Sequence, residues 1–251
     1  MPLDIALLRR LRPQNELHYW ASIGSTMMEA GKLAADGAPH GTVIFADEQT
    51  SGVGRLGRTW QSQPELGIYC SFLFRIPLSP AHVPVASLLF ALATREAIQQ
   101  STNLVCDLRW PNDVLINERK VAGILAQITE SCIIAGIGIN VNHTQFSADL
   151  RTPATSVRIQ SGGKCQSREA IAVALLEGID TFASTLQEQG PRGILHAFAS
   201  ASTYAANRRI FIEDTGAQGT TVGLDEHGFL LVRLDSGEVE RLSAGGVRPV
   251  R

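Results

Sequence analysis

Glycine, arginine and tryptophan are concentrated in one nine-residue segment, residues 52–60 (GVGRLGRTW). Glycines allow a sharp turn and a close approach to a ligand. Arginine adds a positive charge with forked hydrogen-bond donors, and tryptophan adds a flat apolar face. Together these side chains suit a ligand that carries both an anionic group and an aromatic ring, such as a nucleotide.

The spacing of these glycines also matches G-x-G-x-x-G, which marks dinucleotide-binding folds when a strand precedes it and a helix follows it. Residues 42–46 are a candidate strand, but residues 61–67 (QSQPELG) favour a loop. The expected acidic residue about 20 positions further on is also missing near Arg75. We therefore reject the dinucleotide interpretation. For the segment taken alone, a plain connection between two strands remains the alternative.

Two further segments carry residues that could do chemistry, residues 109–113 (RWPND) with Lys120 after them, and residues 136–142 (GIGINVN). A lysine inside an apolar strand is unusual, because burying an unpaired ammonium is costly. The alternative is an edge lysine that discourages strand addition. Glycines inside a strand indicate that another backbone or a ligand approaches closely.

The elements that must position these residues are strands and helices with short connections. A helix is predicted to begin near Ser25 and Thr26, where Thr26 and Glu29 have the capping-box spacing; the alternative is that both hydroxyls are caps and nothing more. Closely spaced strands cannot be joined by parallel crossovers, so the sheet is predicted to be mostly antiparallel. The predicted strands are 42–46, 66–75, 104–110, 114–116, 120–128 and 133–141, and the predicted helices are 1–17, 26–35, 83–100, 167–189 and 193–206.

Beyond residue 206 the pattern changes to short alternating strands with glycine-bearing turns, at 209–213, 219–224, 228–234 and 238–242. Such a pattern is typical of a small β-barrel-like unit. We therefore predict two domains, residues 1–206 and residues 207–251.

Composition excludes several classes of protein. The chain has 251 residues and a net charge of −2, so it has no sequence-wide basic field for nucleic acid or an anionic membrane. It lacks an apolar run of the roughly 18 residues that a membrane span needs, and arginines interrupt the N-terminal apolar residues where a signal peptide would be continuous. The cytoplasm is the expected location. The four cysteines form no C-x-x-C pair and the histidines no H-E-x-x-H, so no protein-held metal site is expected.

Taken in order, the segments 25–26, 49–60, 109–113, 120–125 and 138–140 resemble the biotin protein ligase family. The resemblance covers about residues 20–160. It implies an α+β fold, with a mixed, mostly antiparallel sheet and flanking helices like those of class II aminoacyl-tRNA synthetases. It also implies an SH3-like C-terminal β domain. The N-terminal segment is too short for a helix-turn-helix domain, so the resemblance is to the form that ligates without binding DNA.

The resemblance implies that biotin and ATP, with Mg²⁺ arriving on the ATP, react to biotinyl-5′-AMP, and that biotin then passes to a lysine of a biotin carboxyl carrier domain. It implies catalytic roles for Lys120, Arg55 and Asp113. The implied biotin contacts are Ser25, Thr26, Met27, Gln49, Gly52, Val53, Gly54, Arg55, Lys120 and Gly123. The implied nucleotide contacts are Arg55, Arg58, Trp60, Arg109, Asn112, Lys120, Asn140 and Phe146.

Three positions depart from the family pattern. Val53 and Arg109 stand where the family usually has Arg and Lys, and Met27 stands where Asn is common. Two alternatives stay open. One is attachment of lipoate or octanoate on the same fold, although the R-R-x-S-G-G-G loop of those enzymes is missing here. The other is a non-catalytic biotin or nucleotide sensor. The sequence does not decide whether the chain forms a homodimer.

Overall fold

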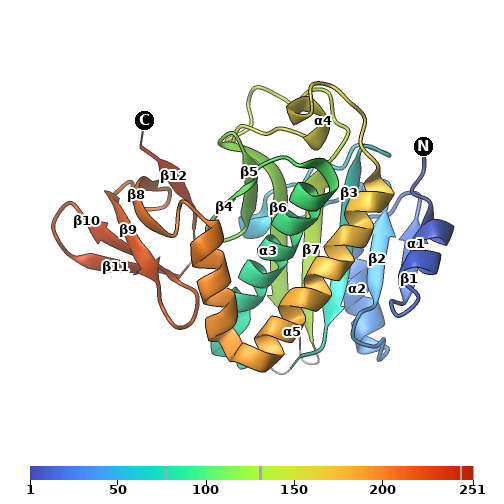
Figure 1. The fold of residues 1–251 in the computed structure, drawn as a ribbon, viewed down its shortest axis with the longest axis horizontal. Coiled ribbons are helices and arrows are strands. Elements are labelled where there is room, and N and C mark those ends of the chain that lie inside the picture. Colours follow the sequence, from blue (N-terminus) through green and yellow to red (C-terminus); the bar gives the residue numbers. More distant parts are fainter. Residues whose placement is uncertain (77, 130–131, 244, 251) are drawn as a thin grey trace.

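The computed structural model describes residues 1–76, 78–129, 132–243 and 245–250. A seven-stranded sheet with helices is followed by a five-stranded sheet at the C-terminal end (Figure 1). The helical elements are α1 (Ile5–Leu11), α2 (Thr26–Ala35), η1 (Arg55–Gly57), η2 (Pro80–His82), α3 (Val83–Thr102), α4 (Val157–Gln160) and α5 (Arg168–Ala201). The strands of the first sheet are β1 (Leu17–Trp20), β2 (Val43–Ala46), β3 (Gly67–Phe74), β4 (Asp107–Arg109), β5 (Asp113–Ile116), β6 (Arg119–Ile128) and β7 (Ile133–Asn140).

The first sheet has the order β1-β2-β3-β7-β6-β5-β4. Its edge strand β1 runs parallel to β2, and the other neighbouring strands pair antiparallel. The prediction of a mixed, mostly antiparallel sheet with flanking helices is therefore confirmed.

The two faces of this sheet differ, and β7 shows how. Side chains alternate between faces along a strand, and every second one from Ile133 to Ile139 belongs to the core that α3 and α5 complete. On the other face, Ile134 packs under α2. The next positions on that face are Gly136, Gly138 and Asn140, so beyond α2 the sheet presents little side-chain bulk. That open stretch leaves room for a site.

The helical face is built from α3 and α5, which cross in front of the strands in Figure 1. Apolar residues of α3 such as Val85 and Leu89 are fully buried there. The helix α5 bends at Gly190, whose φ of 65° and ψ of −168° are not helical, and Pro191 follows inside it. Gly190 therefore separates two helical arms, as predicted, and the second arm ends at Ala201 rather than at 206.

Two further predicted elements are wrong in extent. The N-terminal helix ends at Leu11, and Leu17–Trp20 is a strand. A four-residue edge strand is too short to show a recognisable period. The strand predicted over 104–110 shrinks to Asp107–Arg109, because the Gln99 side chain at the end of α3 accepts the backbone N–H of Cys106.

The C-terminal sheet has the order β11-β10-β9-β8-β12 and antiparallel pairing. Its strands are β8 (Ala206–Ile212), β9 (Gln218–Leu224), β10 (Leu230–Leu234), β11 (Val239–Leu242) and β12 (Val247–Pro249). The predicted small β unit is confirmed, and β12 is an addition to it. The Trp110 indole N–H donates to the carbonyl of Gly228 at 2.9 Å and ties this sheet to the first. The division of the chain at residue 206 stays a prediction.

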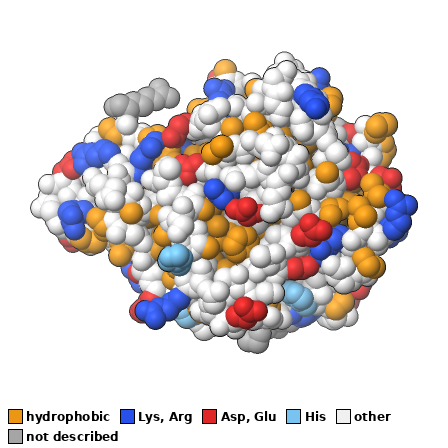
Figure 2. All heavy atoms as spheres, viewed as in Figure 1, with side chains coloured by type: hydrophobic (Ala, Val, Ile, Leu, Met, Phe, Trp, Pro, Cys, Tyr) orange, Lys and Arg blue, Asp and Glu red, His pale blue; other side chains and the backbone are white. Residues whose placement is uncertain are grey.

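On the face shown in Figure 2, acidic and basic side chains are interspersed rather than separated by sign. Within the described residues, no helix is long and apolar enough to cross a membrane.

Candidate active site

Two cavities adjoin one another at the open face of the first sheet. The larger has a volume of about 570 Å³ and the smaller about 50 Å³. The side chains or backbone that border both cavities are those of Gly54, Arg55, Trp60, Asn112 and Lys120. A ligand in one cavity would therefore meet a ligand in the other at Arg55 and Lys120.

The residues predicted from the sequence divide between these cavities. Those assigned to the nucleotide all line the larger one: Arg55, Arg58, Trp60, Arg109, Asn112, Lys120, Asn140 and Phe146. Most of those assigned to biotin line the smaller one: Thr26, Met27, Gln49, Val53, Gly54, Arg55, Lys120 and Gly123. Ser25 and Gly52 are outside the lining of both cavities. The structure thus brings the two predicted sets side by side, and their roles in binding stay predictions.

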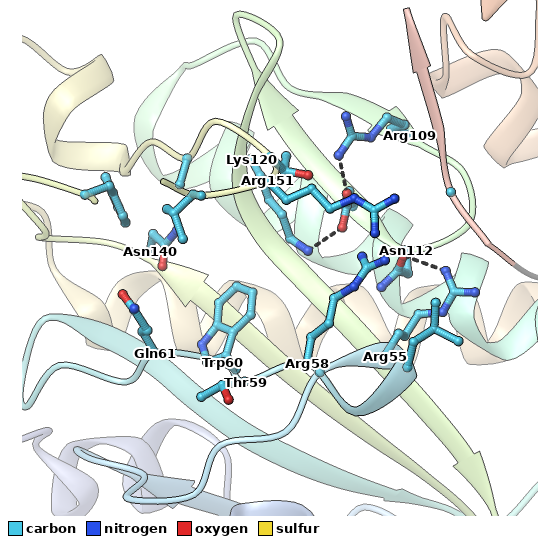
Figure 3. A pocket seen from close by; sticks show the side chains of 18 of the residues that line it. Arg55, Arg58, Thr59, Trp60, Gln61, Arg109, Asn112, Lys120, Asn140 and Arg151 are labelled. Atoms are coloured by element: carbon cyan, nitrogen blue, oxygen red, sulfur yellow. Dashed lines mark hydrogen bonds and ion pairs between the residues drawn. The ribbon is translucent and has the colours of Figure 1, made fainter. Parts of the chain in front are cut away.

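Lys120 lies at the junction, held by a carboxylate from the neighbouring strand. Its Nζ is 2.5 Å from one oxygen of Asp113, and Arg109 Nη2 is 2.5 Å from the other (Figure 3). Burial raises the pKa of the Asp113 carboxyl, but the charges and hydrogen bonds of Lys120 and Arg109 outweigh it and hold the pKa below its usual range. Asp113 is therefore an ionised anchor with both oxygens engaged, and Lys120 directs its cation into the cavities.

The arginine-bearing segment 52–60 forms a short hairpin around the 3₁₀ turn η1. Gly54 N–H donates to the carbonyl of Arg58 at 2.7 Å, and Trp60 N–H donates to that of Gly52 at 2.9 Å. A Cβ on Gly52 would come within 2.5 Å of the Trp60 carbonyl oxygen. Gly52 therefore lets the two ends of the hairpin meet rather than forming a cavity wall.

Arg55 links this hairpin to two other parts of the chain. Its Nη1 donates to Asn112 Oδ1 and to the carbonyl of Gly245, each at 3.1 Å (Figure 3 shows the first of these bonds). Burial lowers the pKa of the Arg55 guanidinium, although Asp113 opposes that effect. One side chain thus joins the hairpin, the turn before β5 and the C-terminal sheet.

The Trp60 ring lies directly on the glycines of the sheet. A Cβ on Gly138 would fall 2.3 Å from Trp60 Cε2, and one on Gly123 would fall 2.9 Å from Cζ3. The Lys120 ammonium is 5.4 Å from the ring centroid, within reach of a cation–π contact. The close approach that the glycines of residues 136–142 predicted is therefore made, at Gly138, by an aromatic side chain.

Replacing Gly138 by alanine is expected to push the Trp60 indole off the sheet and to destabilise the fold by about 1–3 kcal/mol, the usual cost of overpacking. The fluorescence of Trp60 is obtained by subtracting the spectrum of the matching Trp60→Phe protein, with and without Gly138→Ala. In Gly138→Ala this Trp60 emission should be shifted to the red relative to its emission with Gly138 unchanged. Gly31→Ala on α2, where a Cβ would meet nothing within 4 Å, is the matched control. An unchanged Trp60 emission in Gly138→Ala would contradict the packing.

A hydrogen-bond network forms the polar wall of the smaller cavity. Thr26 donates its N–H and its hydroxyl to Gln49 Oε1, both at 2.9 Å, and Gln49 Nε2 donates to Ser62 Oγ at 3.1 Å. The predicted capping box is therefore wrong, because the Thr26 hydroxyl bonds to Gln49 and not to the helix end. Ser25 occupies the N-cap position, yet its buried hydroxyl finds no partner among the described residues.

Met27 is one of the apolar residues that line the smaller cavity. A Cβ on Gly136 would lie 2.7 Å from the Met27 sulfur, so this glycine makes room for the thioether. Val53, the other departure at this cavity, is 45% exposed and pairs with Thr59 across the hairpin. Neither side chain brings a charge to the smaller cavity, which leaves Arg55 and Lys120 as its cations.

The far end of the larger cavity is aromatic and polar rather than charged. Asn140 Nδ2 donates to the carbonyl of Thr155 at 3.1 Å, and Phe146 stacks on His143 with a centroid distance of 5.4 Å. Burial lowers the pKa of His143 to about 4, so its ring is neutral at pH 7. This end suits an uncharged aromatic ring.

Sequence reasoning missed several residues of the larger cavity. Arg151 and His143 lie between β7 and α4, outside every predicted helix and strand, and Glu213, Gly245 and Gly246 lie in loops that border strands β8 and β12 of the C-terminal sheet. No local pattern marks them, since the tertiary fold alone carries them to the cavity. Within the described residues, no group of three or more His, Cys, Asp or Glu side chains could hold a metal ion.

Known proteins share the sequence pattern and the fold of this chain. A sequence profile of the biotin/lipoate A/B protein ligase family matches residues 19–143, and one of the biotin protein ligase C-terminal domain matches residues 207–247. The structure of the biotin protein ligase from Aquifex aeolicus in complex with biotin and ATP superposes with a TM-score of 0.80 at 29% identity, covering 94% of this chain and 99% of that one. The profile matches and the shared fold thus define a protein of the biotin and lipoate ligase class.

Full-length similarity narrows the class. The biotin–[acetyl-CoA-carboxylase] ligase of Mycobacterium tuberculosis is 31% identical over 248 residues, which cover 94% of this chain and 90% of that protein. The bifunctional ligase/repressor BirA of Bacillus spizizenii is 33% identical over 232 residues, 88% of this chain and 70% of that protein. The chain belongs to the biotin protein ligase family, and it is a ligase.

Proposed function

We propose that this protein activates biotin with ATP and transfers it to one lysine of a biotin carboxyl carrier domain. The carrying observation is the junction of the two cavities, where Lys120 and Arg55 face both. Two anionic reactants must meet there, and fixed cations offset the charge that builds up as they react. The ligands named in the Aquifex aeolicus complex, biotin and ATP, support the same pairing.

In the first step, a biotin carboxylate oxygen forms a bond to the α-phosphorus of ATP. The bond from that phosphorus to the β-phosphate bridging oxygen breaks, and pyrophosphate leaves with the electron pair. An ionised carboxylate is already a nucleophile, so this step needs positioning and charge stabilisation rather than a general base. Lys120 would contact the carboxylate and the α-phosphate, Arg55 would contact the same oxygens from the hairpin, and Asp113 would act through Lys120 as a positioning residue.

The smaller cavity would hold the biotin ring. Thr26 and Gln49 are already joined there in one network, and this network can offer donors and acceptors to a ureido group. The larger cavity would hold ATP, with adenine between Trp60, Asn140 and Phe146 at its uncharged end.

In the second step, the amine of an acceptor lysine attacks the acyl carbon of biotinyl-5′-AMP. The bond from this carbon to the phosphate oxygen breaks, AMP leaves, and the amine proton passes to solvent. The name of the Mycobacterium tuberculosis relative supports a carboxylase carrier domain as the acceptor.

Magnesium would enter as the complex with ATP. Of the carboxylates at the larger cavity, Asp113 is paired with Lys120 and Arg109, and Glu213 is paired with arginines. Neither is free to serve as a metal ligand, so the phosphate oxygens would hold the ion, as is usual for Mg²⁺ in nucleotide sites.

Incubating the protein with Mg-ATP, a biotin carboxyl carrier domain and either biotin or octanoate tests the proposal. We expect biotin to be attached to one lysine, detected with streptavidin and as a mass increase, and octanoate to be attached at least about 100-fold more slowly, because the acyl chain cannot satisfy the polar groups of the smaller cavity. Efficient octanoylation would favour the lipoate-type reaction. Biotin binding without any transfer would indicate a sensor.

A further inference from the structure

The C-terminal sheet places one carboxylate at the edge of the larger cavity. Glu213 follows β8, and its side chain is only 7% exposed. Its Oε2 is 3.0 Å from Arg151 Nη2 and 3.8 Å from Arg58 Nη2, and its Oε1 accepts a hydrogen bond from Arg248 Nε. Four segments that are far apart in the sequence therefore meet at one buried anion.

The backbone at Gly246 also helps to fix the position of this carboxylate. Glu213 N–H donates to the carbonyl of Gly246 at 2.9 Å, and a Cβ on Gly246 would come within 2.9 Å of Glu213 Oε2. Burial raises the pKa of the Glu213 carboxyl, but the hydrogen bond from Arg248 and the charges of Arg248, Arg151 and Arg58 hold it below its usual range. Glu213 is therefore ionised and fixed in place.

The three arginines outnumber the carboxylate, so the cluster carries a net positive charge. Arg58 and Arg151 line the larger cavity, whereas Arg248 supports Glu213 from outside the lining. In Figure 3, Arg58 and Arg151 extend into the cavity from two different segments, and their guanidinium groups lie close together. Their side chains are 46% and 53% exposed, so each keeps donors available for a ligand.

The position of this pair within the cavity indicates what it binds. Given the proposed function, adenine takes the end at Asn140 and Phe146, and the α-phosphate lies at the junction beside Lys120. The part of ATP left over is the pyrophosphate, the most highly charged part of the substrate. Guanidinium pairs match phosphate oxygens well.

We propose that Arg58 and Arg151 bind the pyrophosphate portion of ATP, and that Glu213 is the positioning residue that holds both guanidinium groups at the cavity. Two neighbouring guanidinium groups repel each other, and long half-exposed side chains turn readily into solvent. The carboxylate between them removes both tendencies before the substrate arrives. The C-terminal sheet thereby takes part in nucleotide binding.

Steady-state kinetics of adenylate formation test the pair. We expect Arg151→Gln and Glu213→Gln each to raise the KM for ATP about tenfold, as for the loss of one charge-assisted hydrogen bond, with the KM for biotin and the kcat changed less than about twofold. Inorganic pyrophosphate, used as a competitive product inhibitor, should lose affinity in parallel. Asp235→Asn is the matched control, since its carboxylate pairs with Arg209 on the exposed side of the same sheet. An unchanged KM for ATP in Arg151→Gln would overturn the proposal that Arg58 and Arg151 bind the pyrophosphate portion of ATP.

A mutant cycle separates positioning from general support. Because Glu213 pairs with both Arg58 and Arg151, the background must lack both guanidinium groups. If Glu213 acts only through them, Glu213→Gln should raise the KM for ATP less than about twofold further in an Arg58→Gln/Arg151→Gln background. A full additional tenfold increase would overturn the positioning role. A lower KM for ATP in the single variant Glu213→Gln would show instead that the carboxylate competes with the substrate.

Preformed biotinyl-5′-AMP separates this inference from the proposed function. Transfer from it to the acceptor involves no pyrophosphate, so both variants should transfer biotin at the wild-type rate. Slower transfer would mean that the substitutions disturb the whole site, which contradicts a role limited to binding the pyrophosphate portion of ATP. If the wild-type protein forms no adenylate at all, the proposed function fails, whatever the variants do.

Discussion

Replacing Lys120 by alanine is expected to lower the rate of biotinyl-adenylate formation by at least about 10²–10³-fold, the loss typical of one preorganised charge-stabilising donor. Lys120 lies where the two cavities meet, and its ammonium is fixed by Asp113 at 2.5 Å. No other lysine reaches the cavities within the described residues. Because both reactants are anions, removing this cation raises the cost of bringing them together.

The fold should survive this substitution. Asp113 keeps its second partner, Arg109, so its charge stays compensated. Lys32→Ala, which removes an exposed lysine paired with Glu29 on α2, is the matched control. Biotin-dependent exchange of labelled pyrophosphate into ATP measures the step directly, and thermal unfolding checks the fold. Near-normal exchange in Lys120→Ala would remove Lys120 from the mechanism.

Replacing Arg55 by glycine is expected to release the adenylate from the enzyme. Arg55 fastens the hairpin 52–60 through its bonds to Asn112 and to the carbonyl of Gly245. Without the guanidinium, the hairpin loses both tethers and the intermediate loses a cation. Hydrogen bonds to a charged group contribute about 1.5–3 kcal/mol each, so dissociation of biotinyl-5′-AMP should become about 10–100-fold faster.

The consequence should be visible in what becomes labelled. Free biotinyl-5′-AMP reacts with exposed lysines, so Arg55→Gly should biotinylate an added bystander protein as well as the carrier domain. The wild-type protein should label the carrier domain alone. Arg55→Lys keeps the positive charge but lacks the planar guanidinium with its forked donors, so its labelling of the bystander protein should be intermediate. Labelling confined to the carrier domain in Arg55→Gly would show that Arg55 does not retain the intermediate.

The sequence predicted the main sheet well because each strand carries a strong local signal. Strand β3 and helix α3 lie within two residues of their predicted limits, since continuous apolar runs and a clear helical period are local properties. The wrong predictions fell where a tertiary contact outweighs the local pattern. Thr26 bonds to Gln49 instead of capping α2, and Leu17–Trp20 becomes a strand only because β2 lies beside it.

The sequence by itself determined the chemical character of the site. The glycine- and arginine-bearing segment 52–60, Lys120 in an apolar strand, and Gly136 and Gly138 are all readable in order along the chain. These residues predict an anionic, ring-bearing ligand, because only their side-chain types and backbone freedom are needed for the argument.

The tertiary structure alone decided how charges are paired and where the cavities meet. Asp113 serves Arg109 because the β4–β5 pair sets these two residues opposite each other, and it serves Lys120 across the bulged β5–β6 pair. Glu213 reaches Arg58 and Arg151 from more than 60 positions away along the chain. Electrostatic attraction depends on distance in space and on burial, and neither quantity is encoded in the spacing of residues along a chain.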